Sequence, residues 1–151
     1  MSYHDYMRLR RLAVAWLPAI VWMGLIFYLS AQPRPLGKTP SPALAYVAHF
    51  GEYAVLAFLL FWAQLSRGSW KGKLRLALAP SFVASVLFAA SDEYHQSFVA
   101  GRDASWLDFA TDAVGAAFAL AVIGRWGHSF LWRQVRYRRT VLPVDPRRGR
   151  P

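Results

Sequence analysis

Four apolar segments, each long enough to cross a bilayer, alternate along the chain with segments rich in charged residues or prolines. They cover residues 12–30, 44–65, 74–93 and 106–124. A helix needs about 20 mostly apolar residues to span a hydrocarbon core of about 30 Å. The pattern predicts an all-α fold, a four-helix transmembrane bundle over residues 12–124. A short N-terminal segment (residues 1–11) precedes it and a tail (residues 125–151) follows it.

The first apolar segment also has features of a secretory signal peptide, because arginines precede it and the small residues Ser30 and Ala31 end it. It has 19 residues without a charged side chain, which is longer than the apolar region of a typical signal peptide. Leu29 also fits a cleavage site poorly. We therefore expect this segment to be retained as a membrane-spanning helix.

Basic residues are distributed unevenly about the predicted spans. With four spans, 15 of the 18 lysines and arginines lie on one side of the membrane, in the N-terminal segment, the second loop and the tail. Only Arg34, Lys38 and Arg102 lie on the other side. By the positive-inside rule, both termini are cytoplasmic, and the proline-rich loop over residues 31–43 is outside.

The composition agrees with a membrane protein that has basic ends. Hydrophobic residues make up 56% of the chain, yet the formal net charge is +10, a combination seldom found in soluble proteins. The tail mixes arginines with Trp126, Phe130 and Trp132, which predicts an interfacial helix on anionic lipid followed by a disordered end. Because the positive-inside rule already accounts for the arginines, we expect no nucleic acid partner. The absence of cysteine excludes disulfides, thiolate catalysis and cysteine metal sites.

The acidic residues are concentrated at the outer end of the predicted bundle. Six of the eight lie there, together with two histidines. These residues are His49, Glu52, Asp92, Glu93, His95, Asp103, Asp108 and Asp112. The second and fourth spans begin on that side and the third ends there, so the three spans should bring the side chains together. A charged side chain inside a bilayer normally faces the bundle interior, because its insertion at mid-bilayer costs about 2.5–3.5 kcal/mol.

The spacing of these residues predicts shared helix faces. His49, Glu52 and Tyr53 follow an i, i+3, i+4 pattern, which Asp92, His95 and Gln96 repeat. We expect one outer-facing cavity to be lined by His49, Glu52, Asp92, His95, Arg102 and Asp108. The candidate catalytic residues are Glu52, Asp92, His49 and His95, which are also the expected ligands of any metal ion. The candidate substrate-binding residues are Arg102, Tyr53, Glu93, Gln96, Asp108 and Asp112. A structural hydrogen-bond network between helices stays open as the alternative.

Three motifs in these segments resemble those of VanZ-like membrane proteins. The first is Ser30-Ala31-Gln32-Pro33 and the second is His49-Phe50-Gly51-Glu52-Tyr53. The third begins with Ser91-Asp92-Glu93-Tyr94-His95-Gln96 and continues through Gly101-Arg102 to Asp108, Asp112 and Gly115. Gly115 and Ala119 also form a small-xxx-small pattern, which permits close helix packing. Many members of that family carry an Asp-Lys pair shortly before the histidine, where this chain has Ala45 and Tyr46.

The resemblance implies a multi-pass protein of the bacterial cell membrane that acts at the outer face, on or around cell-envelope components. The family is named for a protein that confers low-level resistance to teicoplanin, a glycopeptide that acts on cell-wall precursors. A link to glycopeptide antibiotic resistance is therefore implied as well.

Three functions fit these observations. The first is an envelope-binding or protective protein, whose ligand is an outer-leaflet lipid-linked or glycopeptide-related molecule. The second is a membrane-embedded enzyme that acts on a lipid or lipid-linked substrate by carboxylate and histidine chemistry, with or without a metal ion. The third is a proton or ion path, which intramembrane carboxylates often mark. We prefer the first, because the sequence contains no legible Ser-His-Asp pattern and the inner halves of the spans lack ionisable residues.

Overall fold

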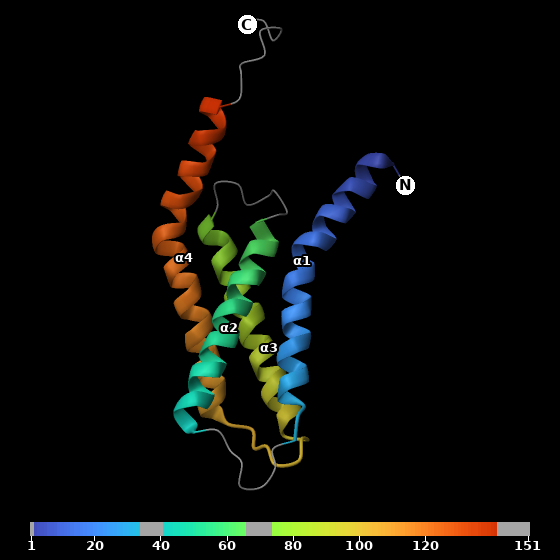
Figure 1. The fold of residues 1–151 in the computed structure, drawn as a ribbon, viewed down its shortest axis with the longest axis vertical. Coiled ribbons are helices and arrows are strands. Elements are labelled where there is room, and N and C mark those ends of the chain that lie inside the picture. The colour runs from blue at the N-terminus through green and yellow to red at the C-terminus, as the bar shows by residue number, and fades with distance from the viewer. Residues whose placement is uncertain (1, 34–40, 66–73, 142–151) are drawn as a thin grey trace, which may run out of the picture.

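The computed structural model of the chain contains four consecutive antiparallel helices (Figure 1). They are α1 (Tyr3–Ser30), α2 (Pro42–Leu65), α3 (Leu74–Gln96) and α4 (Trp106–Val141). The structure describes the backbone of residues 2–33, 41–65 and 74–141, and their side chains except those of residues 4, 8, 11, 74, 75 and 127–141. Each helix contains a segment long and apolar enough to span a membrane. The predicted all-α fold with four spanning helices is therefore confirmed.

The helices are longer than the predicted spans at four of their ends, one of which is the start of α2, at Pro42 and not at residue 44. α1 begins at Tyr3, well before residue 12, because Ser2 and Asp5 form a capping box in which each side chain accepts a hydrogen bond from the other residue's backbone. α3 continues to Gln96, and α4 continues through the basic segment to Val141. The tip of the proline-rich loop (residues 34–40), the second loop (residues 66–73) and the end of the tail (residues 142–151) lie outside the described residues.

The two ends of the bundle are distinguished by the helix ends that lie there. We call the end with the chain termini the proximal end, and the end where α1 and α3 finish and α2 and α4 begin the distal end.

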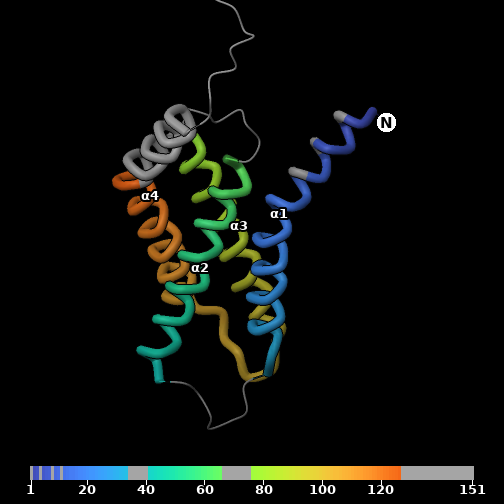
Figure 2. The backbone as a smooth tube through the Cα atoms, turned by 45° about the horizontal axis from the view of Figure 1, so that its top comes forward, coloured from blue at the N-terminus to red at the C-terminus, as the bar shows by residue number. Residues whose placement is uncertain are grey.

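The N-terminal half of α1 leans away from the other helices in two views (Figure 1, Figure 2). That helix contains Pro18, which lacks an N–H and so removes one helical hydrogen bond. Among the described residues, α1 packs on α2 and α3 but not on α4.

The closest packing in the bundle joins α2 to α4, which share its most extensive interface. Gly115 lies directly against the backbone of Phe50, so near that a Cβ atom there would be 2.3 Å from the Phe50 carbonyl oxygen. Ala57 and Ala116, both fully buried, continue this contact toward the proximal end. The small residues therefore allow the close approach that the Gly115 pattern predicts.

A buried polar cluster joins α2 to α3 in the proximal half. The side-chain amide of Gln64 donates to Ser81 Oγ at 2.7 Å, and Ser81 Oγ donates to the Ala77 carbonyl at 2.8 Å. Ser85 Oγ donates to the Ser81 carbonyl at 2.9 Å. None of these groups is charged, and hydrogen bonds of this kind join spanning helices.

Substituting Ser81 with alanine should lower the stability of the bundle by about 1 kcal/mol, because the buried Gln64 amide loses its acceptor. Unfolding in detergent, followed by circular dichroism, measures the change. Ser91→Ala is the matched control on the same helix, since Ser91 is exposed. Equal unfolding midpoints for the two variants would show that the hydrogen bond has no effect on stability.

Candidate functional site

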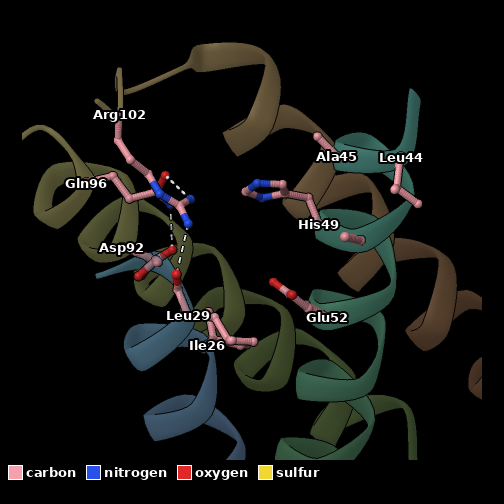
Figure 3. Close-up of a pocket in the computed structure, with 11 residues that line it drawn as sticks. Ile26, Leu29, Leu44, Ala45, His49, Glu52, Asp92, Gln96 and Arg102 are labelled. Carbon is pink, nitrogen blue, oxygen red and sulfur yellow. Dashed lines mark hydrogen bonds between the residues drawn. The ribbon is translucent and has the colours of Figure 1, made fainter. Parts of the chain in front are cut away.

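A cavity of about 270 Å³ lies at the distal end between α1, α2, α3 and the loop after α3 (Figure 3). Its apolar wall is formed by Ile26, Leu29, Leu44, Ala45 and Ala48. Its polar wall is formed by Ser30, His49, Glu52, Asp92, Gln96 and Arg102. No residue of α4 lines the cavity within the described part of the chain. The cavity therefore combines an apolar side with a compact group of polar side chains.

Glu52 and His49 enter the cavity from α2 and point toward Asp92, Gln96 and Arg102 on the opposite side (Figure 3). The indole N–H of Trp22 on α1 donates to the Glu52 carbonyl oxygen at 2.9 Å, which fixes this part of α2 against α1. Within the described residues, no group donates a hydrogen bond to the Glu52 carboxylate itself. The backbone of Glu52 is therefore held in place, while its carboxylate accepts no hydrogen bond from the described residues.

Asp92, in contrast, is fully engaged by neighbouring side chains. Ser30 Oγ donates to Asp92 Oδ1 at 2.6 Å, and the Gln96 amide donates to Asp92 Oδ2 at 2.9 Å. Only 2% of the residue is exposed. Asp92 therefore joins the end of α1 to the end of α3, and its carboxylate is held in one orientation.

Arg102 closes the distal end of the cavity. Its guanidinium donates to the carbonyl oxygens of Leu29, at 2.8 Å from Nη2, and Gln32, at 3.3 Å from Nε. Nη1 also donates to Gln96 Oε1 at 3.2 Å, so the network continues to Asp92. A cation at the C-terminus of α1 is favoured by the helix dipole. Gly101, with φ of 74°, provides the left-handed turn that directs Arg102 toward α1.

A second polar group, which we call the buried triad, consists of His49, Glu93 and Asp112, from α2, α3 and α4. His49 Nδ1 and Asp112 Oδ1 are 3.0 Å apart, and one potential ligand atom from each residue lies within 4.8 Å of the others. Glu93 is oriented by the backbone N–H of Ser105, which donates to its Oε2 at 2.7 Å. Two ionised carboxylates about 4.8 Å apart repel by about 3.5 kcal/mol at an effective dielectric constant of about 20, so a neighbouring cation would stabilise the pair.

Some polar atoms around the buried triad have no partner within the described residues. Asp112 is fully buried, and its Oδ2 makes no hydrogen bond. The hydroxyl of Tyr53, also fully buried and one turn after His49, makes none either. Such atoms are rare in protein interiors because leaving them unsatisfied costs about 1–3 kcal/mol each.

The structure divides the predicted site residues between these groups. His49, Glu52, Asp92, Gln96 and Arg102 line the cavity, and His49 also joins Glu93 and Asp112 in the buried triad. Tyr53 belongs to the apolar core, where its ring packs against Phe88. The ring of His95 stacks on that of Phe27 with centroids 4.0 Å apart, and Asp108 is half-buried in the first turn of α4. His95 and Asp108 are thus absent from the cavity lining, in contrast to the expectation for both.

The group of potential metal ligands also differs from the expected one. The sequence pattern suggested His49, Glu52, Asp92 and His95, whereas the described residues that lie close enough are His49, Glu93 and Asp112. Asp92 and Glu93 are consecutive on α3 and therefore point in different directions, the first toward α1 and the second toward α4. Helical spacing along one segment cannot determine which of them meets His49.

Several residues of the site were not predicted to contribute to it. Ser30 orients Asp92, and the Gln32 carbonyl accepts from Arg102. The sequence did contain a signal for Ser30 and Gln32, because both lie in the Ser30-Ala31-Gln32-Pro33 motif. The apolar wall had no such signal, since its residues resemble any others in a spanning helix. Ala45, where the family resemblance suggests an aspartate, is part of that wall.

Comparison with known proteins agrees with this arrangement of motifs. The family model described as VanZ/LLP1 matches residues 15–127, which contain most of the first apolar segment, all of the other three, and every polar residue of the cavity and the buried triad. Searches of curated proteins and of solved structures gave no match. Since the match covers most of the chain and its four helices can each span a membrane, this multi-pass membrane protein belongs to the VanZ/LLP1 family.

Proposed function

We propose that this protein acts in the cell membrane, where its distal cavity opens at the outer face and binds the head group of an envelope lipid. The orientation is supported by the basic residues, since 15 of 18 belong to the sequence segments that precede α1, join α2 to α3 or follow residue 124, or lie in the adjoining helix ends, and the positive-inside rule makes that side cytoplasmic. In this orientation the cavity lies at the depth of the outer head groups and the adjoining acyl chains.

The observation that carries the proposal is the carboxylate of Glu52, which accepts no hydrogen bond from the described residues and lies in a cavity with one apolar wall. A buried or half-buried acid without a donor is unfavourable in a membrane-spanning helix, so a ligand that donates to it gains binding energy. The apolar wall of Ile26, Leu29 and Ala48 suits the first methylenes of an acyl chain or the apolar face of a sugar. An amphiphile satisfies both halves of the cavity at once.

The size of the cavity limits the ligand. A volume of about 270 Å³ is near the lower limit of pockets for drug-sized molecules, which begin at about 300 Å³. A lipid head group such as one sugar fits this space, whereas a whole glycopeptide antibiotic is too large. Any effect on glycopeptide tolerance is therefore indirect, through the envelope component that the protein binds or shields.

The charges of the cavity favour some head groups over others. Among the described residues that line the cavity, Glu52 and Asp92 face a single guanidinium, and that guanidinium already donates to Leu29, Gln32 and Gln96. A bare phosphate is disfavoured by this balance. The head group that fits best is rich in hydroxyl, amide or ammonium donors, which the Glu52 carboxylate accepts.

Lipid retention tests the proposal directly. The protein is purified in a mild detergent from membranes that contain their native lipids, and retained lipids are identified by native mass spectrometry. Ala48→Trp fills the cavity without removing a polar group and should abolish retention of one specific lipid class. Val47→Trp is the matched control, because Val47 is 68% exposed and does not line the cavity. Equal retention by both variants would refute lipid binding in this cavity.

A membrane-embedded enzyme is the second candidate, favoured by the contact between His49 and Asp112. A carboxylate 3.0 Å from an imidazole nitrogen orients the ring, as in sites where histidine acts as a general base. His49 also lines the cavity, so a bound head group lies within its reach. Chemical conversion of the retained lipid by the wild type, lost in His49→Gln, would establish this candidate. The proton or ion path has no such support, since the buried polar residues described in the proximal half are uncharged.

A further inference from the structure

We infer that the buried triad of His49, Glu93 and Asp112 binds a divalent transition-metal ion, of the class to which zinc and manganese belong. The inference rests on contacts among α2, α3 and α4 and does not depend on the proposed lipid ligand. Each residue contributes one ligand atom, and the three residues come from three different helices. A bound ion would therefore join these helices next to the cavity, which His49 also lines.

The distances suit a shared ion. Two ligand atoms each about 2.1 Å from one ion lie about 3.0 Å apart at a right angle and about 3.4 Å apart at the tetrahedral angle. His49 Nδ1 and Asp112 Oδ1 are 3.0 Å apart. The atom of Glu93 is within 4.8 Å of both, so a small rotation of that side chain completes the set. The Ser105 N–H bond to Glu93 is the kind of second contact that orients a metal ligand.

An independent observation supports the binding of a cation at this place. Asp112 is 0% exposed, and its Oδ2 has no hydrogen-bond partner among the described residues. Glu93 and Asp112 together carry two negative charges when ionised, and a divalent ion neutralises both. The alternative to a metal site is a purely structural hydrogen bond between His49 and Asp112, but that contact leaves Asp112 Oδ2 without a hydrogen-bond partner among the described residues.

The donor set selects the class of ion. Magnesium and calcium prefer oxygen ligands alone, whereas an imidazole nitrogen favours zinc or manganese. Without cysteine in the chain, a closed structural zinc site of the thiolate kind is impossible. Three protein ligands leave a coordination position for water or a ligand, as in catalytic zinc sites. His49 belongs to both the triad and the cavity lining, so this open position can face the cavity.

The test measures metal content in the full chain. Protein carrying an affinity tag without histidines is purified with EDTA, dialysed separately against zinc, manganese or magnesium chloride, and analysed by inductively coupled plasma mass spectrometry. The wild type should retain about one zinc or manganese ion per chain and no magnesium. Asp112→Asn and Glu93→Gln should lower the metal affinity by at least about tenfold. Asp103→Asn, which changes an exposed loop acid, should retain the ion.

Two further measurements keep the inference testable if a triad variant fails to fold. Zinc or manganese should raise the unfolding temperature of the wild type, and EDTA should reverse the change. Glu52→Gln should retain the ion, because Glu52 lies outside the triad. A wild type without bound metal, or metal lost in Glu52→Gln but kept in Glu93→Gln, would overturn the assignment. Since Ala48→Trp tests lipid retention separately, the failure of one proposal is distinguishable from the failure of the other.

Discussion

Replacing Gly115 with alanine should destabilise the bundle by about 3 kcal/mol or more. The added Cβ would lie 2.3 Å from the carbonyl oxygen of Phe50 and 3.0 Å from its carbonyl carbon and Cα. All three are backbone atoms, so no side-chain rotation relieves the clash and α2 must move away from α4. Phe50 follows His49, and Gly115 lies one turn after Asp112. The same movement therefore separates His49 from Asp112.

Gly24→Ala provides the matched control for this substitution. Gly24 is also in a helix, but nothing lies within 4 Å of a Cβ built there. Alanine is the better helix former, so Gly24→Ala should be neutral or stabilising by up to about 1 kcal/mol. Unfolding in detergent measures both variants. A Gly115→Ala protein as stable as the wild type would mean that the two helices do not approach as closely as the structure shows.

Glu52→Gln should leave the protein folded at normal abundance while weakening binding of the proposed envelope lipid roughly 10- to 150-fold. A charge-assisted hydrogen bond is worth about 1.5–3 kcal/mol, which corresponds to that range. The glutamine has nearly the same shape, and the Glu52 carboxylate makes no hydrogen bond within the described residues that the change would break. Retained lipid and glycopeptide tolerance of cells should both fall to the level without the protein.

Asp92→Asn should behave differently, although Asp92 and Glu52 line the same cavity. Both Asp92 oxygens accept hydrogen bonds, from Ser30 and Gln96. In the asparagine variant, the side-chain NH₂ group would replace one of these oxygens and would face a hydrogen-bond donor that it cannot accept from. We expect reduced stability of about 1–3 kcal/mol and lower membrane abundance. Quantitative immunoblotting and detergent unfolding separate the two outcomes. A Glu52→Gln protein with normal lipid retention and normal tolerance would remove Glu52 from the function.

Much of the fold follows from the sequence, because four predominantly apolar segments of spanning length permit few other arrangements. The positions of the helix ends are less easily predicted from the sequence. The predicted span begins nine residues after the start of α1, because hydropathy marks where a helix can enter lipid, whereas the helix starts at the Ser2 and Asp5 capping box. α4 continues beyond residue 124 for the same reason, since loss of hydropathy does not end a helix.

The location of the candidate site could be predicted from the sequence, but the pairs of side chains that contact one another could not. The depth of His49, Glu52 and Asp92 in their segments indicates that they meet at one end of the bundle. Which side chains meet depends on how each helix is rotated about its axis, and that rotation is determined by contacts such as Gly115 on Phe50. The contact between His49 and Asp112, 63 positions apart, therefore had no signal in local spacing.

Thiol labelling in intact cells tests most directly whether the cavity opens outside and holds a ligand. The chain has no cysteine, so a single introduced cysteine is the only reactive thiol. Ala48→Cys, in the cavity wall, and Ser97→Cys, in the distal loop, are treated with a membrane-impermeant maleimide, and Trp126→Cys serves as the proximal control.

We expect rapid labelling of Ser97→Cys, and slower labelling of Ala48→Cys that becomes faster when Glu52→Gln is combined with it, since the ligand no longer shields the cavity. Trp126→Cys should react only after the cells are permeabilised. Labelling of Trp126→Cys in intact cells, with Ala48→Cys and Ser97→Cys protected until permeabilisation, would contradict an outward-facing cavity.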